Sequence, residues 1–330
     1  MSKRVKELDV FSGIAILCVV LIHSNAFYLM SVLNLQIYED ANFLVRLLDN
    51  FVHGAVPMFI FIAGYKYALN NINDNYTEYV LKKINNVMKP FLVISMIFLI
   101  KNILSFPNYF NVKTVIIEII YIFMGYNTAY QLWYIPMYFF IVCTYPIIYK
   151  VFKEKIRIFV ILFIFLLHCV LSVKFNILSK CPFNFIHYYL FFEMGLIFCK
   201  YNLKNYIQKK GIFIIICFIC FTVIITINTN IEWNIILKKC LLYPFSVVSY
   251  YILSLKLINS KLFYFLGKYS FYIFLLHEPI ICSGISNYFK IIGVYNSMIF
   301  VFISCILTII MTIIVYKVID KTFLKNILFN

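Results

Sequence analysis

Long runs of apolar residues alternate with short polar stretches along the whole chain. Most runs have roughly 18 residues or more, the length that an α-helix needs to cross about 30 Å of hydrocarbon. Helices are the expected spanning elements, because they satisfy their backbone hydrogen bonds internally. The run 113–124 is shorter and contains Glu118, so we expect an interfacial or re-entrant helix there. The pattern predicts an all-α fold, a polytopic transmembrane helix bundle with about ten spans: 10–30, 51–69, 88–105, 131–150, 157–173, 184–199, 211–228, 235–255, 264–284 and 295–316.

The composition agrees with a chain that resides in a lipid bilayer. Of the 330 residues, 64% are hydrophobic and 13% are charged, and the mean hydropathy is +0.92. A soluble domain of this length has too little interior to bury so much apolar surface. The polar stretches between the runs are short. We therefore expect residues 1–330 to form a single integral-membrane domain, with any chemistry in or beside the helix bundle.

The net charge of +16 is distributed unevenly along the chain. With the N-terminus placed inside, 21 of the 29 Lys and Arg residues fall on the inner side of the predicted spans. This bias follows the positive-inside rule and predicts that both termini are cytoplasmic. Topology thus accounts for the basic residues, and a nucleic-acid partner is not expected.

All five histidines fall in the outer half of the predicted membrane region. His53 and His187 lie near span ends and are expected at the interface, whereas His168 is expected to make an interhelical hydrogen bond. His23 and His277 lie deeper, where an ionisable group is usually paired, functional or both. Depth alone does not separate packing from catalysis at these two positions.

A stripe of residues follows one face of the first predicted span. Eleven residues separate Ser12 from His23, which returns to within about 20° of the same face. Two interpretations stay open: the stripe lines a passage through the protein, or it is an ordinary packing face. Its members are Asp9, Ser12, Ile16, Val19 and His23.

Five segments carry a family resemblance. "LDVFSGIAILCVVLIH" (8–23) is similar to the LD-x-x-R-x-x-A motif, apolar run and histidine that open acyltransferase family 3, a family of integral-membrane proteins. "VPMFIFIAGY" (56–65) is similar to its VP-x-F-F-x-x-SGY segment, and "LKKINNVMKP" to the basic stretch before its third span. "LWYIPMYFF" resembles its LW-[FY] segment, and "LGKYSFYIFLLHEPII" its closing LG-x-x-S-x-x-x-Y-L-x-H motif. Five matches in family order are strong evidence for membership.

The resemblance implies an enzyme, a membrane-bound O-acetyltransferase. Such proteins typically move an acetyl or other short acyl group from cytosolic acetyl-CoA, or another acyl-CoA, to a carbohydrate hydroxyl. The expected acceptor is a cell-surface polysaccharide or its precursor, and the expected location is the cell membrane with several passes. The expected partners are acyl-CoA, the carbohydrate acceptor and the lipid bilayer, without a permanently bound cofactor or a metal. The acceptor sugar, the acyl chain and the oligomeric state do not follow from these motifs.

The family's histidine matches His23, which we expect to be the catalytic general base, alone or shared with His277 if their helices are adjacent. Neutral imidazole can take the proton of a sugar hydroxyl as that hydroxyl attacks a thioester carbonyl. The mid-span carboxylate Glu193 either orients a histidine, binds sugar hydroxyls or packs in its neutral form. Asp9, at the cytosolic end of the stripe, is a further supporting candidate.

Several positions depart from the family pattern on the donor side. The arginine of the first span is replaced by Ser12, the serine of SGY by Ala63, and the R-x-x-R pair by Lys83 and Asn86. Lysine is a point charge and does not reproduce a bidentate guanidinium clamp on phosphate. These changes indicate either a rearranged donor site or a member that has lost acyl transfer. We favour the first, with Ser12, Lys82, Lys83 and Lys89 as donor-binding residues.

The alternative function is a non-catalytic transporter or export component for a surface polysaccharide. The missing arginine favours this alternative. The sequence, however, shows neither an inverted repeat nor a pair of broken spans of the kind found in secondary transporters. The enzyme therefore remains the first hypothesis.

Overall fold

The computed structural model describes residues 5–27, 43–70, 75–126, 131–175, 184–228, 230–293, 297–322 and 325, and these residues form helices without a strand. Every predicted span contains at least one helix, and seven helical stretches of the described chain are long and apolar enough to cross a membrane. The all-α class is confirmed, whereas ten spans and cytoplasmic termini stay predictions. The predicted span ends 28–30 and 295–296 and both chain ends lie outside the described residues.

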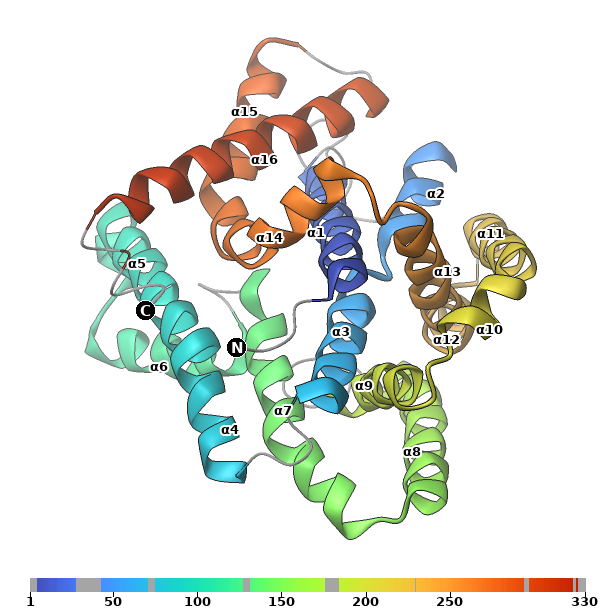
Figure 1. Ribbon diagram of the computed structural model, residues 1–330. Helices are drawn as coiled ribbons and strands as arrows, with labels where there is room; N and C mark the ends of the chain where they lie inside the picture. The colour runs from blue at the N-terminus through green and yellow to red at the C-terminus, as the bar shows by residue number, and fades with distance from the viewer. Residues whose placement is uncertain are drawn as a thin grey trace. The chain divides into compact units, whose positions relative to one another are not determined.

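The helices are labelled in Figure 1 and differ widely in length. The shorter run 113–124 forms α6, as expected for a piece that is not a full span. The helices are α1 (Lys6–Phe27), α2 (Phe43–Val52), α3 (Ala55–Asn70), α4 (Tyr76–Lys83), α5 (Lys89–Ser105), α6 (Val112–Met124), α7 (Tyr134–Val151), α8 (Glu154–Lys174), α9 (Phe185–Lys200), α10 (Lys204–Lys209), α11 (Gly211–Ile227), α12 (Ile231–Leu237), α13 (Tyr243–Lys256), α14 (Lys261–Leu276), α15 (Cys282–Ile291) and α16 (Ser297–Asp320).

The chain divides into two compact units. Unit 1 comprises Met1–Leu69 and Phe191–Tyr316, and unit 2 comprises Asn70–Leu190 and Lys317–Asn330. Unit 1 thus contains α1–α3 and most of α9–α16, whereas unit 2 contains α4–α8. Both His23 and His277 belong to unit 1, and the basic stretch with Lys82, Lys83 and Lys89 belongs to unit 2.

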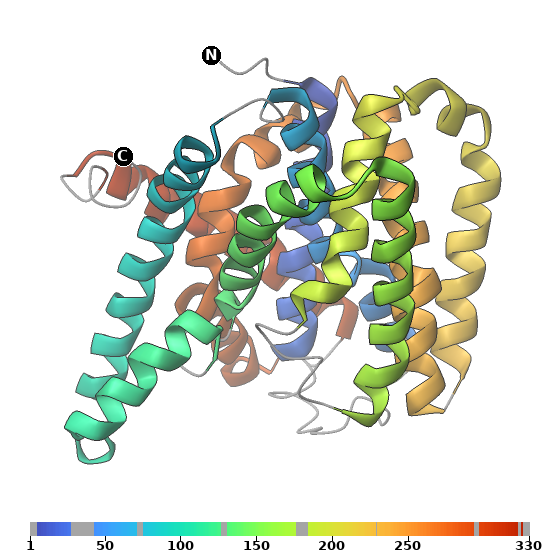
Figure 2. The same ribbon diagram turned by 90° about the horizontal axis from the view of Figure 1, so that it is seen from below.

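Two glycines fix the central helix pair of unit 1. α1 and α14 run side by side in the same direction (Figure 2), and they approach so closely that added methyl groups would collide. A Cβ on Gly13 would overlap the carbonyl oxygen of Phe263, and a Cβ on Gly267 would overlap that of Asp9. Small residues allow such close approach in a membrane, where packing rather than the hydrophobic effect drives helix association. The crossing sets the register of the two helices along their whole length.

Prolines accompany three π-helical interruptions of the helices. Ile84–Met88 precedes Pro90, Lys238–Leu242 precedes Pro244, and His277–Ile281 contains Pro279. Proline lacks an N–H and its ring clashes with the preceding turn, so it favours a kink or an interruption in a helix. The third interruption is the sharpest, because Glu278 has a non-helical backbone with φ −127° and ψ 154°. It leaves His277 at the free C-terminal end of α14.

Candidate active site

His23 and His277 face each other inside unit 1. Their ring centroids are 4.9 Å apart, and the ring planes are inclined by 62°. His277 is fully buried at the end of α14, whereas His23 on α1 is only half-buried. The two helices are adjacent, which is the condition under which the sequence allowed His277 to share the role of the base. One imidazole belongs to a partly exposed residue, and the other is fully enclosed next to it.

The position of the proton on His277 follows from its neighbours. Its Nδ1 lies 3.0 Å from the carbonyl oxygen of Ile273 and 2.9 Å from that of Phe274. A carbonyl oxygen only accepts hydrogen bonds, so Nδ1 carries the proton and donates. Nε2 then holds a lone pair, and it is buried without a hydrogen-bond partner within the described part of the chain. His277, the residue that follows α14, thus has a buried Nε2 with a lone pair inside unit 1.

Buried polar groups surround the end of α14. The carboxylate of Glu278 has no exposed surface, and the adjacent Cys282 is also fully buried. The Cys282 Sγ lies 3.8 Å from the Oγ of Ser24, the residue that follows His23. Glu278 was not among the residues predicted for the site, although its place in "LLHEPII", directly after a deep histidine, was a usable signal. The interruption of α14 therefore collects polar groups close to the histidine pair.

The stripe on α1 is a packing face in its middle part. The Oγ atoms of Ser12 and Ser270 are 2.9 Å apart, so the residue in place of the family arginine pairs with the serine of the LG-x-x-S motif. Ile16 and Val19 are 0% and 4% exposed. Of the two interpretations, the structure supports the packing face at these residues. Asp9, at the start of the stripe, is half-buried against α14.

The predicted donor-side lysines lie around the first π-helical interruption in unit 2. Lys82 lies in the last turn of α4 and Lys89 begins α5, and both are exposed. Lys83 is held more firmly, because its Nζ donates a hydrogen bond to the Oη of Tyr138 over 3.1 Å. The same ammonium lies 5.3 Å from the ring centroid of Tyr79 and 5.7 Å from that of Tyr138, within cation–π range. Tyr138 belongs to the "LWYIPMYFF" segment, so two family-like motifs meet at Lys83.

Glu193 is buried in α9 of unit 1, with 2% of its surface exposed. It follows the boundary at which α9 leaves unit 2. Close by, a Cβ on Gly195 would overlap the carbonyl oxygen of Phe61, and a Cβ on Gly64 would overlap that of Phe192. α3 and α9 therefore cross as closely as α1 and α14 do. The assignment of Glu193 as a supporting residue stays a prediction.

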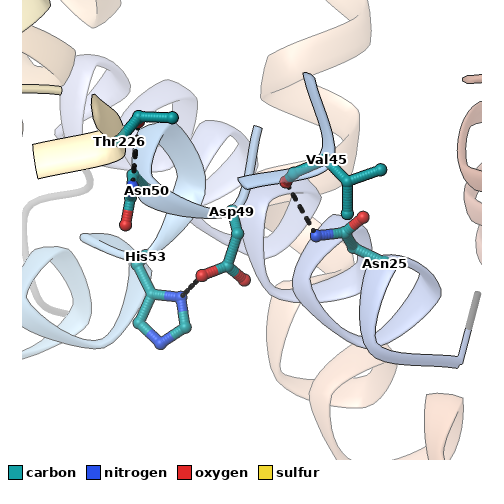
Figure 3. A network of polar contacts seen from close by, with 6 residues as sticks. All are labelled: Asn25, Val45, Asp49, Asn50, His53 and Thr226. Atoms are coloured by element: carbon teal, nitrogen blue, oxygen red, sulfur yellow. Dashed lines mark hydrogen bonds and ion pairs between the residues drawn. The ribbon is translucent and has the colours of Figure 1, made fainter. Parts of the chain in front are cut away.

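A second polar cluster, shown in Figure 3, lies on α2, a helix that the predicted spans did not include. The Asp49 carboxylate lies 3.2 Å from Nδ1 of His53, one turn further along. The Asn25 Nδ2 donates to the carbonyl of Val45 over 3.3 Å. His53 was predicted only as an interfacial residue. The D-x-x-x-H spacing was the missed signal, since residues four apart share a helix face.

Polar contact also extends from the α2 cluster to α11. The Asn50 Nδ2 donates to Oγ1 of Thr226 over 3.0 Å (Figure 3). Thr226 in turn donates to the carbonyl of Thr222. The cluster therefore ties the short helix α2 to the apolar helix α11.

Two more histidines pair in unit 2. The ring centroids of His168 on α8 and His187 on α9 are 5.9 Å apart. His187 stacks on Phe165 with a centroid distance of 4.9 Å, and its Nδ1 lies 3.7 Å from the Sγ of Cys169. Both histidines are buried, with 4% and 2% exposure. The expected interhelical role of His168 agrees with this packing, whereas His187 is enclosed rather than interfacial.

Comparison with known proteins provides independent information. A family model, acyltransferase family 3, described as an acyltransferase domain, matches residues 5–317 and so spans both units. Searches of curated proteins and of solved structures found no match. The match covers nearly the whole chain and includes every motif on which the sequence resemblance rests. This multi-pass membrane protein therefore belongs to acyltransferase family 3.

Proposed function

We propose that the protein transfers an acetyl or other short acyl group from acyl-CoA to a carbohydrate hydroxyl, on a surface polysaccharide or its precursor at the cell membrane. The observation that carries the proposal is the histidine pair. An accessible imidazole lies beside a buried, neutral one whose proton is committed to the backbone. This is a suitable arrangement for moving a proton at a hydroxyl.

The proposed reaction uses His23 as the general base. As the acceptor oxygen bonds to the thioester carbonyl carbon, its proton moves to His23. The carbon–sulfur bond then breaks, and the proton passes from His23 to the departing thiolate, so that the products are an ester and free CoA. The lone pair on Nε2 of His277 stabilises the transient imidazolium of His23. Two adjacent imidazoles share one positive charge far more easily than they carry two.

The donor's phosphates are assigned to the basic stretch of unit 2. Lys82, Lys83 and Lys89 supply cations without the family arginines, and Tyr138 positions one of them. Ser12 does not supply a charge, because serine is neutral. Its hydroxyl is paired with that of Ser270. The proposed donor site thus relies on point charges rather than on bidentate clamps.

The test compares the surface glycan of cells with and without the gene. The proposal expects ester-linked acetyl groups in the first and none in the second, and restoration by the wild-type gene. Membranes that contain the protein should also transfer label from radioactive acetyl-CoA to the purified, alkali-deacylated glycan. Equal ester content in both strains, together with no transfer in membranes, would refute the proposal.

Export of a polysaccharide is the second candidate, and one observation favours it. The sequence showed no broken span, but the structure interrupts α14 at Glu278, and discontinuous helices are common at transporter sites. If export is the function, deletion should remove the glycan from the surface and leave the ester content per sugar unchanged. Loss of ester on a normally exported glycan would exclude it.

A further inference from the structure

Exposed lysines gather at one end of unit 1, on and around the short helix α10. The sequence 194–231 contains four lysines and neither Asp nor Glu. Three of these lysines, Lys200, Lys209 and Lys210, are exposed, and so is Lys256 at the end of α13. We call these four exposed residues the α10 basic face. They have no part in the chemistry described so far.

The packing of α11 against α13 brings two parts of this face together. A Cβ on Gly211, the first residue of α11, would lie 3.2 Å from the side chain of Ile252 on α13. Lys209 and Lys210 directly precede Gly211, and Lys256 lies one turn beyond Ile252. Charges from two separate segments are therefore collected at the same end of two neighbouring helices.

A carboxylate at this end of unit 1 is already neutralised. The Nζ of Lys204, on α10, lies 3.3 Å from Oε1 of Glu7 in the first turn of α1. The Nζ of Lys6 donates to Oδ1 of Asn259, in the turn after α13, over 3.3 Å. Figure 2 shows the start of α1, α10 and the turn after α13 at the same end of the unit. The fold thus holds the basic face in place and uses Glu7 for a different lysine.

The remaining cations are not neutralised by the protein. Lys209, Lys210 and Lys256 form no ion pair with the residues that the structure describes. Like charges that the fold holds together repel one another and attract anions. An anionic ligand would therefore relieve the repulsion at this end of unit 1.

The face lies where lipid headgroups are expected. It is at the ends of Lys6–Ala26 and Glu232–Lys256, two of the stretches that are long and apolar enough to cross a membrane. The apolar helix α11 begins beside it. Because a spanning helix is matched in length to the hydrocarbon core, its ends lie at the level of the headgroups.

The aromatic residues around α10 are typical of a membrane–water interface. Tyr201 and Tyr206 are 53% and 65% exposed, whereas the neighbouring Ile207 is only 5% exposed. The Nζ of Lys200 lies 5.3 Å from the ring centroid of Tyr201. Tyrosine is enriched at the headgroup level, because its ring is apolar and its hydroxyl is polar. α10 therefore anchors one apolar side chain in unit 1 and presents tyrosines and lysines to its surroundings.

We infer that the α10 basic face binds the headgroups of anionic phospholipids. The inference goes beyond the proposed function, because it concerns a lipid and neither the donor nor the acceptor. Lysine binds phosphate as a point charge, and a group of basic residues beside a membrane span is typical of anionic-lipid recognition. The lipid phosphates neutralise the lysines, and the exposed tyrosines lie among the headgroups.

The test follows thermal unfolding of the purified full chain in detergent as lipid is added. A ligand that binds only the folded state raises the unfolding temperature as its concentration rises. Dioleoylphosphatidylglycerol should therefore raise the unfolding temperature of the wild-type protein more than zwitterionic dioleoylphosphatidylcholine does. Equal effects of the two lipids on the wild-type protein would overturn the inference.

The decisive variant combines Lys209→Ala, Lys210→Ala and Lys256→Ala. One lysine near an anionic lipid surface strengthens association about fivefold. The triple variant should therefore bind phosphatidylglycerol at least about 10-fold more weakly, and the difference should shrink at about 0.5 M salt. An affinity equal to that of the wild-type protein would contradict the inference. If the triple variant does not fold, Lys209→Ala alone should weaken binding about fivefold, and an unchanged affinity in this single variant would count equally against it.

Two control variants separate the site from general effects. Arginine at the same three positions keeps the charge and should keep the effect of phosphatidylglycerol. Lys101→Ala, Lys113→Ala and Lys174→Ala together remove three exposed charges from α5, α6 and α8 of unit 2, and this variant should also keep the effect. An equal loss in the unit 2 variant would mean that only the net charge matters, and the inference would fall.

Coenzyme A is the second ligand, and it separates lipid from donor phosphates. Any stabilisation by coenzyme A should be the same in the wild-type protein and in the triple Ala variant of the α10 basic face. Loss of that stabilisation in the variant would overturn the inference, because the face would then hold the phosphates of the donor. These measurements need no acyl transfer, so a failure of the proposed function would leave their result unaffected.

Discussion

The molecule contains two interhelical histidine pairs that look alike in the sequence and differ in the structure. His23 and His277 meet in unit 1 with ring centroids 4.9 Å apart, and His168 and His187 meet in unit 2 at 5.9 Å. All four residues lie in apolar segments. Location in an apolar segment therefore does not distinguish the pairs.

Their surroundings do distinguish them. In unit 2 both rings are enclosed. The ring of His187 stacks on Phe165, and its Nδ1 lies next to the Sγ of Cys169. In unit 1 one ring is accessible, and the other has a proton fixed by two carbonyls and a buried Nε2 without a partner in the described residues. A reactive imidazole needs access and an available lone pair. The comparison teaches that the partial exposure of one ring separates the pair of unit 1 from the pair of unit 2.

The largest expected effect comes from breaking the unit 1 pair at its accessible ring. Glutamine in the His23→Gln variant can hydrogen bond but cannot take up a proton. Loss of a general base should lower the transfer rate by roughly 10²–10⁴-fold. The measurement is initial-rate transfer of labelled acetyl per molecule of inserted protein. A rate within a few fold of wild type would show that His23 is structural. The histidine pair of unit 1 would then differ from that of unit 2 in exposure but not in function.

The next effect comes from moving the two rings apart without changing either. Gly267→Val places a branched side chain against the backbone at Asp9, so α14 must shift away from α1. Misplacement of reacting groups by about 1 Å can reduce a rate by about 10²-fold. Overpacking should also lower the free energy of unfolding by about 1–3 kcal/mol.

Gly284 offers a matched control for that substitution. A Cβ at this exposed position on α15 would meet no heavy atom within 4 Å. Gly284→Val should therefore keep both the rate and the thermal stability in detergent. Equal losses in the two valine variants would mean that the α1–α14 crossing has no special role.

A smaller effect is expected from the basic stretch of unit 2. Replacing Lys82, Lys83 and Lys89 with Ala should raise the KM for acetyl-CoA by about 5- to 30-fold at low salt, from exposed charge pairs that each contribute about 1 kcal/mol or less. The difference should shrink at about 0.5 M salt, because screening weakens the wild-type interaction as well.

The control for the lysines keeps the change in charge constant. Lys150, Lys153 and Lys155 are also exposed residues of unit 2, on and after α7. Their triple Ala variant should have a nearly normal KM for acetyl-CoA. An equal rise in both triple variants would indicate a general effect of net charge, and the donor's phosphates would have to be held elsewhere.

Much of the fold was predictable, because apolar length and helix formation are linked in a membrane. The match of His23 to the family motif and the adjacency of His277 could also be anticipated. The meeting of His23 and His277 depends on Gly13 and Gly267, whose close approach is a property of packing that periodicity does not encode. Helix faces alone therefore left the role of the stripe through Ser12 open.

The parts that the sequence did not predict are local departures from regular helix. α2 lies mostly before the predicted span 51–69, so the pairing of Asp49 with His53 was missed. The break at Glu278 depends on Pro279 within an otherwise apolar span, and it places the tautomer of His277 under the control of backbone carbonyls. Such features arise from tertiary context, which single-sequence patterns describe poorly.

The smallest effect is expected from a change in the histidine pair of unit 2. His168→Gln alters the enclosed pair of unit 2, where the ring packs against His187 and is 4% exposed. Removal of one interhelical polar contact in a membrane bundle should lower stability by about 0.6–1.7 kcal/mol. The transfer rate per folded molecule should stay within about twofold of wild type, because an enclosed imidazole has no access to the substrate. The two readouts are thermal unfolding in detergent and initial-rate acetyl transfer. A loss of rate similar to that of His23→Gln, at normal stability, would show that the enclosed pair also takes part in the chemistry, and access would no longer distinguish the two units.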